Sequence, residues 1–195
     1  MSAERCASPW ATRPNCTSTA TAAGPPPDPP PRCANRTGPG ITLAEGLCPA
    51  DDVLGRRWLV RGRPVPFLAD ESAITPGEVT RTLLDGDATA ISIKAARTGA
   101  ALSRRVFLPC EGLGAEVVMG NQIDGRSGTV RTVALGAAHA TASRRPGELS
   151  DFQDMSDDLL TEPIEITGDT LAVCHSPGSG VSIDPSKLTR YRQNH

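Results

Sequence analysis

Three ionisable residues end successive short apolar runs of this 195-residue sequence: Glu45, Asp70 and Lys94. Their spacings of 25 and 24 residues match about one strand–helix unit each. In a barrel of parallel strands the C-terminal strand ends share one mouth, where active sites are built. Two carboxylates at adjacent strand ends suit a hard divalent cation such as magnesium, and a lysine at the next strand end suits acid/base chemistry.

Each of these signals also has a simpler interpretation. An acid that ends a strand is more often a loop residue or a helix cap than a ligand, and a lysine there usually extends to solvent. The ordered series of three residues is what favours a site.

The elements that must position these residues alternate along the chain. "TPGEVTRTLLDG" predicts a helix with Thr75 as N-cap and Pro76 at its first position, and "AALSRRVFLPCEGLG" and "GTVRTVALGAAHATAS" predict two more. In "DTLAVCHSPGSGVSID" we predict two strands around the Pro-Gly turn, and in "PSKLTRYRQ" a final helical turn. Five apolar runs predict strands, the last of them weakly: 41–45, 65–70, 89–94, 115–120 and 148–152. The sequence therefore predicts an α/β fold with a parallel sheet, part of a TIM-like (β/α) barrel of about five strand–helix units.

The composition changes near residue 40. Residues 1–40 hold nine of the 18 prolines and almost no core-forming residues, so we expect a disordered, low-complexity segment before the barrel part at 41–195. A proline-rich ligand for a recognition module, an extension without function and a rearranged 5′ coding region all remain as interpretations.

The net charge of −2 gives no electrostatic case for nucleic acid or an anionic membrane surface. The six cysteines form no C-x-x-C pair, which argues against a zinc site. The N-terminus has no secretory apolar segment, so we expect free thiols and a cytoplasmic protein.

Six motifs between residues 41 and 193 resemble the enolase superfamily, in its mandelate racemase and muconate lactonizing enzyme branch: "LAEGLCP", "LADES", "ISIKAARTG", "VVMGNQIDGRSGT", "ELSDF" and "SPGSGVSID". The muconate cycloisomerase-like subgroup fits best. The resemblance implies removal of a proton α to a carboxylate, with magnesium (or manganese) stabilising the enolate, and interconversion of muconate and muconolactone in aromatic catabolism.

The resemblance also implies roles for single residues. Glu45 and Asp70 are implied metal ligands, with Glu71 supporting Asp70. Lys94 is the implied general acid/base, and Glu148 a polar catalytic partner of the substrate. The implied substrate-binding residues are Asn121, Gln122 and Asp124. The implied partners are a small carboxylate substrate and, for full-length relatives, further copies of the same chain.

Several parts of the family pattern are not found where they are expected. These are a first metal ligand near residue 19, a Lys-x-Lys strand end, the first three barrel strands and the capping domain. We therefore expect the chain as given to be truncated, poorly stable and inactive alone. Alternatives are another racemase, epimerase or dehydratase of the superfamily, a non-catalytic barrel fragment, or a subunit completed by another chain.

Overall fold

A computed structural model describes residues 42–61 and 65–192. The segment expected to be disordered, 1–40, lies outside the described residues. The described residues form two compact units. The first unit holds the described residues up to Ile93 together with Arg104–Val117, and the second holds Lys94–Ser103 and the chain from Val118 onward.

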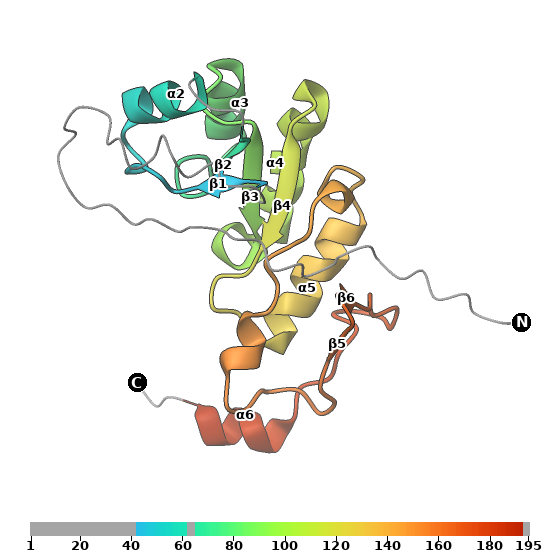
Figure 1. Ribbon diagram of the computed structural model, residues 1–195. Coiled ribbons are helices and arrows are strands. Elements are labelled where there is room, and N and C mark those ends of the chain that lie inside the picture. The colour runs from blue at the N-terminus through green and yellow to red at the C-terminus, as the bar shows by residue number, and fades with distance from the viewer. Residues whose placement is uncertain (1–41, 62–64, 193–195) are drawn as a thin grey trace, which may run out of the picture. The chain divides into compact units, whose positions relative to one another are not determined.

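The strands form a parallel sheet in the order β1-β2-β3-β4, in which sequential strands are neighbours (Figure 1). Glu45 pairs with Leu68, and Leu68 with Ala90, which sets the register of the first three strands. The three residues of β2 are all buried, as expected of a parallel strand covered on both faces. The bounds are β1 Ala44–Glu45, β2 Phe67–Ala69, β3 Ala90–Lys94 and β4 Glu116–Gly120. The predicted α/β fold with a parallel sheet is confirmed.

The helix after β2, α3 (Pro76–Leu84), begins as its sequence predicts. The Thr75 hydroxyl accepts from the Glu78 N–H at 3.3 Å, and the Glu78 carboxylate accepts from the Thr75 N–H at 2.8 Å. These reciprocal bonds form a capping box, and Pro76 occupies a position where no N–H is needed. They also lower the pKa of Glu78, because the backbone and hydroxyl donors stabilise its charged form.

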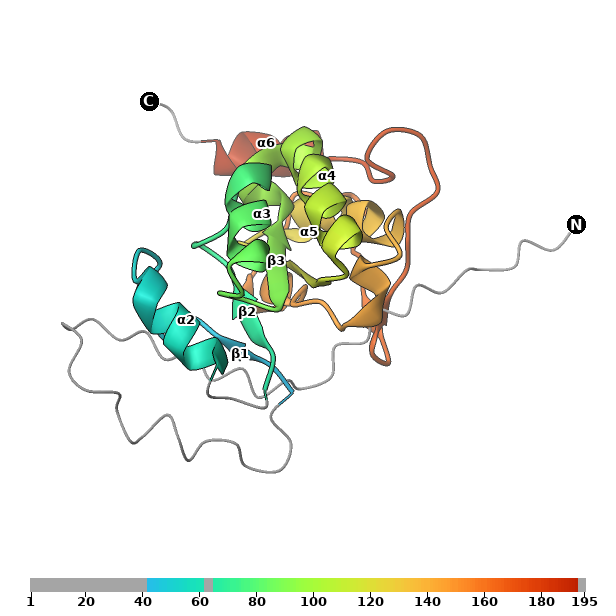
Figure 2. The same ribbon diagram turned by 90° about the horizontal axis from the view of Figure 1, so that it is seen from above.

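Three further helices follow the other strands. The helix after β1, α2 (Val53–Arg61), is not foreseen by the sequence pattern and runs beside β1 (Figure 2). The predicted helices α4 (Ala95–Leu113) and α5 (Arg126–Ala137) are confirmed, although Gly99, at φ 72°, divides α4 into two segments.

The fifth predicted strand is reduced to one parallel bridge between Gly120 and Glu148. The Glu148 N–H donates to the Met119 carbonyl at 2.8 Å, and the Asn121 N–H donates to the Glu148 carbonyl at 2.9 Å. Short 3-10 turns lie on either side of this bridge, η1 (Ala142–Arg144) and η2 (Asp151–Asp154).

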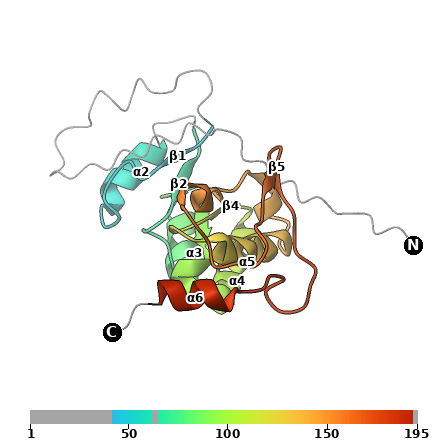
Figure 3. The ribbon, with the colours of Figure 1, turned by 90° about the horizontal axis from the view of Figure 1, so that it is seen from below.

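The prediction of a hairpin around the Pro-Gly turn of the tail is wrong. The hairpin lies earlier, between β5 (Ile166–Thr167) and β6 (Thr170–Leu171), with Gly168 at φ 60° in its turn. Ile183 instead bridges Leu160. The final helix α6 (Pro185–Tyr191) is confirmed, and Figure 3 shows it with α5 and β5.

Cys48, Cys110 and Cys174 are free thiols, as expected, and burial raises the pKa of Cys110 to about 12. The other three cysteines lie outside the described residues. Among the described helices there is no candidate for a bilayer-spanning segment.

Candidate functional site

Glu45 and Asp70 lie at the C-terminal ends of the neighbouring strands β1 and β2, in the first unit. Glu45 pairs with Leu68 of β2 in the parallel register, and Asp70 lies two residues after Leu68. Their side chains are buried, with exposed fractions of 7% and 5%. Glu71, next to Asp70, is exposed.

The chemistry of this pair fits a magnesium ion. Both side chains supply carboxylate oxygens, and magnesium takes oxygen ligands while keeping several waters. Residues 42–61 and 65–192 contain no group of three or more His, Cys, Asp or Glu side chains arranged to hold a metal. The described chain thus offers a two-carboxylate set, which waters and a substrate carboxylate would complete.

Lys94 is the last residue of β3, the strand that pairs with β2. It belongs to the second unit, and its side chain is half-buried. The strand before it is buried, so the backbone that carries the amine is fixed by the sheet. The Thr98 hydroxyl donates to the Lys94 carbonyl at 3.3 Å and fixes the start of α4.

The loop between β4 and α5, residues 121–125, carries the other predicted site residues. The Asn121 side-chain amide is buried and donates to the Thr129 hydroxyl at 2.9 Å, while Gln122 is exposed. Because the Asn121 N–H also bonds the Glu148 carbonyl, the second unit brings Asn121 and Glu148 together.

Asp124 is buried in the same loop, and its Oδ2 atom has no hydrogen-bond partner in the described chain. Burial raises the pKa of the carboxyl, and the Asp151 charge acts in the same direction. The Gln122 N–H and the Lys94 cation lower the pKa of Asp124 and so oppose both of these effects. A Cβ on Gly128 would lie 3.0 Å from the Asp124 Cβ, so the glycine leaves the space that Asp124 fills.

Asp151 is a site residue that sequence reasoning missed. Its Oδ2 accepts from the Ile123 N–H at 2.9 Å, across 28 positions of sequence. Ile123 lies between Gln122 and Asp124, and its side chain is 82% exposed. The motif "ELSDF" contained Asp151, but no spacing rule links it to Ile123.

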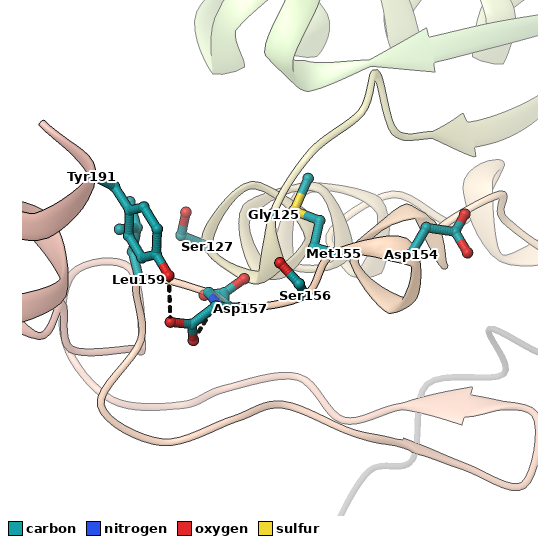
Figure 4. Close-up of a pocket in the computed structure, with 9 residues that line it drawn as sticks. Gly125, Ser127, Asp154, Met155, Ser156, Asp157, Leu159 and Tyr191 are labelled. Atoms are coloured by element: carbon teal, nitrogen blue, oxygen red, sulfur yellow. Dashed lines mark hydrogen bonds between the residues drawn. The ribbon is translucent and has the colours of Figure 1, made fainter. Parts of the chain in front are cut away.

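A cavity of about 580 Å³ opens elsewhere in the second unit, between the loop 154–159 and α6 (Figure 4). Asp157 accepts from the Tyr191 hydroxyl at 2.7 Å and from the Lys187 ammonium at 3.0 Å. These donors hold the pKa of Asp157 well below its usual range, because both stabilise the carboxylate. The predicted site residues do not line this cavity.

The start of α5 is capped from this loop. Its N-cap residue, Gly125, has no side chain to accept a hydrogen bond. The Asp158 carboxylate does so instead, accepting from the Arg126 N–H at 2.7 Å and the Leu160 N–H at 3.0 Å. The Arg126 guanidinium lies 5.1 Å from the centre of the Phe152 ring and donates to the Ile164 carbonyl at 3.3 Å. The C-terminal segment is thus fixed to the helix that carries the loop 121–125.

A family model described as "Enolase C-terminal domain-like" matches residues 31–187 of the chain. The matched segment covers most of the sequence and every predicted site residue, from Glu45 to Glu148.

Single relatives and solved structures resemble the same region. The crystal structure of a muconate lactonizing enzyme from Mucobacterium Smegmatis is 56% identical, with a TM-score of 0.76 over 79% of this chain and 43% of that one. The same enzyme has a structure complexed with muconolactone. The L-Ala-D/L-Glu epimerase of Bacillus subtilis is 28% identical over 74% of this chain, and muconate cycloisomerase 1 of Rhodococcus opacus 27% identical over 80%. The chain spans about two fifths of the length of these two relatives, 39% and 42%.

Proposed function

Because the chain belongs to the enolase C-terminal domain-like family, we propose that it carries the C-terminal barrel part of a magnesium-dependent muconate cycloisomerase-type enzyme. The observation that carries this proposal is the 56% identity to the Mucobacterium Smegmatis muconate lactonizing enzyme over 79% of this chain. The Bacillus subtilis L-Ala-D/L-Glu epimerase matches at 28% identity, and the muconate cycloisomerases of Rhodococcus opacus and Pseudomonas putida match at 27% and 26%. The substrate would be a small dicarboxylate or its lactone.

In this proposal Glu45 and Asp70 hold the cation, because they are buried acids at neighbouring strand ends. Glu71 supports Asp70 from the adjacent position, where a polar neighbour can orient a ligand carboxylate. When bound, a divalent cation would neutralise the negative charge that develops on a substrate carboxylate as its α-proton leaves.

Lys94 moves the proton. In the lactone-forming direction a carboxylate oxygen of muconate adds to the carbon–carbon double bond, and the Lys94 ammonium gives a proton to the carbon α to the other carboxylate. In the reverse direction the neutral Lys94 amine takes that proton as the ring oxygen leaves. The sheet holds the backbone of Lys94, which favours a fixed position for its nitrogen.

Glu148 and the loop 121–125 would contact the substrate. Asn121, Gln122 and Asp124 supply amide and carboxyl groups on that loop, and Glu148 is tied to Asn121 through the backbone. Asp124 is buried on that loop, and burial raises the pKa of its carboxyl.

A dipeptide epimerase activity is the second candidate, because the Bacillus subtilis L-Ala-D/L-Glu epimerase is 28% identical over 148 residues. It would use the same proton transfer on carbon without ring closure. The two candidates differ in substrate: a dipeptide carries an ammonium group, and muconate does not.

A chimera tests the proposal. Residues 42–192 replace the matching C-terminal part of the Mucobacterium Smegmatis enzyme, so that the partner sequence supplies the part that this chain does not match. We expect muconate turnover that depends on magnesium and is lost in Lys94→Ala, with no turnover of L-Ala-L-Glu. Asp154→Asn, an exposed acid in η2, is the matched control and should retain activity.

A folded chimera without muconate turnover would contradict the proposal, and epimerisation of L-Ala-L-Glu in its place would establish the second candidate. Circular dichroism and the oligomeric state, compared with the parent enzyme, show whether the chimera has folded.

A further inference from the structure

The loop 121–125 turns outward and back within a few residues. Asn121 and Asp124 are buried, whereas Gln122 and Ile123 between them are exposed. The backbone makes this turn with a φ of 55° at Ile123, a conformation that a β-branched residue rarely adopts. The isoleucine side chain is 82% exposed, so its packing does not hold the loop in this shape. The unfavourable φ is therefore offset by another contact.

Asp151 supplies that contact. Its Oδ2 atom accepts from the Ile123 N–H at 2.9 Å, and a hydrogen bond to a charged acceptor is stronger than one between neutral groups. The φ could relax by a flip of the peptide between Gln122 and Ile123, or by a rotation that moves the chain at Asp124. The hydrogen bond opposes the flip, because a flip would turn the N–H away from Asp151.

The Asp151 carboxylate is held in place by its own segment. Phe152, the next residue, is 2% exposed, and the Arg126 guanidinium lies 5.1 Å from the centre of its ring. The Gln153 N–H donates to the Ser150 carbonyl at 2.8 Å and closes the turn η2, which begins at Asp151. The acceptor of the Ile123 N–H thus belongs to a packed turn that does not depend on the loop for its shape.

The two ends of the loop are fixed by other contacts. The Asn121 N–H donates to the Glu148 carbonyl at 2.9 Å, and the Asp124 side chain fills the space left by Gly128. Asp151 acts on the residue between these fixed points. Its charge also reaches the Asp124 carboxyl, whose pKa it raises.

We propose that Asp151 is a positioning residue, which holds the Ile123 N–H and so keeps the loop 121–125 in the conformation that binds substrate. This inference rests on the proposed function, in which that loop contacts the substrate. Without the hydrogen bond the peptide at Ile123 relaxes, and the loop presents its polar groups in other directions. The amine of Lys94 is carried by β3 and does not depend on the loop. Loss of Asp151 should therefore weaken substrate binding and leave the proton transfer unchanged.

Hydrogen exchange on the purified full chain tests the hold on the loop without any need for turnover. In Asp151→Ala the Ile123 amide should exchange about tenfold faster. The Asn121 amide, which bonds the Glu148 carbonyl, should keep its protection. Asp154→Ala removes an exposed acid from the same turn and should change neither amide. Equal exchange of the Ile123 amide in wild type and Asp151→Ala would overturn the proposal.

Kinetics of the chimera with the Mucobacterium Smegmatis enzyme tests the positioning role. We expect Asp151→Ala to raise KM for muconate about tenfold and to leave kcat within about twofold. A purely structural role would give the opposite result, because partial unfolding lowers the amount of active enzyme and hence kcat, while KM of the folded molecules stays the same. Adding Ile123→Gly to Asp151→Ala should restore most of the lost affinity, because glycine adopts a positive φ without help from the carboxylate.

An unchanged KM in Asp151→Ala, or a raised KM that Ile123→Gly does not lower, would contradict the positioning role. Asp151→Asn is a milder second variant, which keeps an acceptor oxygen and should raise KM by less. Circular dichroism shows whether each variant has folded. A chimera without turnover, in which the Ile123 amide still responds to Asp151→Ala, would count against the proposed function and not against the hold of Asp151 on the loop. The Kd for muconolactone, measured by calorimetry, then takes the place of KM.

Discussion

Asp151 holds the backbone of Ile123 through a hydrogen bond of 2.9 Å, and Ile123 has a φ of 55°. It is the one non-glycine residue with a positive φ in the described ranges 42–61 and 65–192. A β-branched residue rarely adopts this conformation, because its Cβ lies too close to the backbone carbonyls. The strained residue lies in the loop that carries Asn121 and Asp124.

We predict that Ile123→Gly raises the free energy of unfolding by about 1 kcal/mol, because glycine adopts a positive φ without strain and the isoleucine side chain makes little contact. Urea denaturation of the purified chain measures the change. Ile123→Val is the matched control and should give no gain, since valine is also β-branched. A destabilising Ile123→Gly would show that the isoleucine is held for its packing.

The capping of α5 by Asp158 leads to a second prediction. Asp158→Ala removes the acceptor of the Arg126 N–H in a buried place and should lower the free energy of unfolding by about 1–2 kcal/mol. Asp158→Asn keeps an acceptor oxygen and should lose less. Hydrogen exchange at the Arg126 amide gives a local readout, and unchanged protection there in Asp158→Ala would contradict the capping role.

Local patterns predicted the parallel sheet and most of its helices. The capping box at Thr75 and Glu78 is a contact between residues three apart, so the sequence alone specifies it. The helix α2 was missed because Gly55 interrupts a short segment and Leu54 and Trp58 point outward, which leaves no clear amphipathic pattern.

Long-range contacts could not be predicted. The tail hairpin has its turn at Gly168, and Ile183, which was predicted to pair across the Pro-Gly turn, instead bridges Leu160, 23 positions away. The predicted site residues fell at strand ends or in the loop 121–125, which periodicity locates well. The contact of Asp151 with Ile123 joins two loops, and no periodic pattern connects them.

Tyr191 is the single tyrosine of the sequence, so its ionisation can be followed by absorbance. The hydrogen bond to Asp157 raises the pKa of Tyr191, because the nearby carboxylate disfavours tyrosinate. We predict that Asp157→Asn lowers this pKa toward the ordinary value of about 10. Asp154→Asn is the control and should leave the titration unchanged. Identical curves for wild type and Asp157→Asn would contradict the contact between α6 and the loop 154–159.

Asp124 predicts a pH dependence of stability. Its pKa is raised in the folded state, mainly by burial, so the folded protein binds this proton more tightly than the unfolded chain. The stability that Asp124 contributes is complete below its ordinary pKa of about 4 and is lost as pH rises through the folded pKa. Asp124→Asn does not titrate, so its free energy of unfolding should increase relative to wild type across that pH range.

Urea denaturation at a series of pH values measures this difference, and Asp154→Asn controls for the loss of one negative charge at an exposed position. A difference between Asp124→Asn and wild type that stays constant with pH would show that Asp124 keeps its ordinary ionisation in the folded protein.

The buried pair Glu45 and Asp70 predicts stabilisation by magnesium. A ligand that binds the folded chain raises its stability, by about 2.7 kcal/mol at a hundredfold excess over its Kd. We expect magnesium to raise the unfolding temperature of wild type, and the rise to disappear in Glu45→Gln and in Asp70→Asn. Glu71→Gln should weaken magnesium binding about 10- to 100-fold, because Glu71 supports a ligand in our proposal.

Asp51→Asn removes an exposed acid from the same unit and should keep the full effect of magnesium, which separates a specific site from general attraction of cations. Chelation should return wild type to its starting temperature. Equal shifts in wild type, Glu45→Gln and Asp70→Asn would mean that the two strand-end carboxylates do not hold the ion, and the proposed chemistry would then lose its metal.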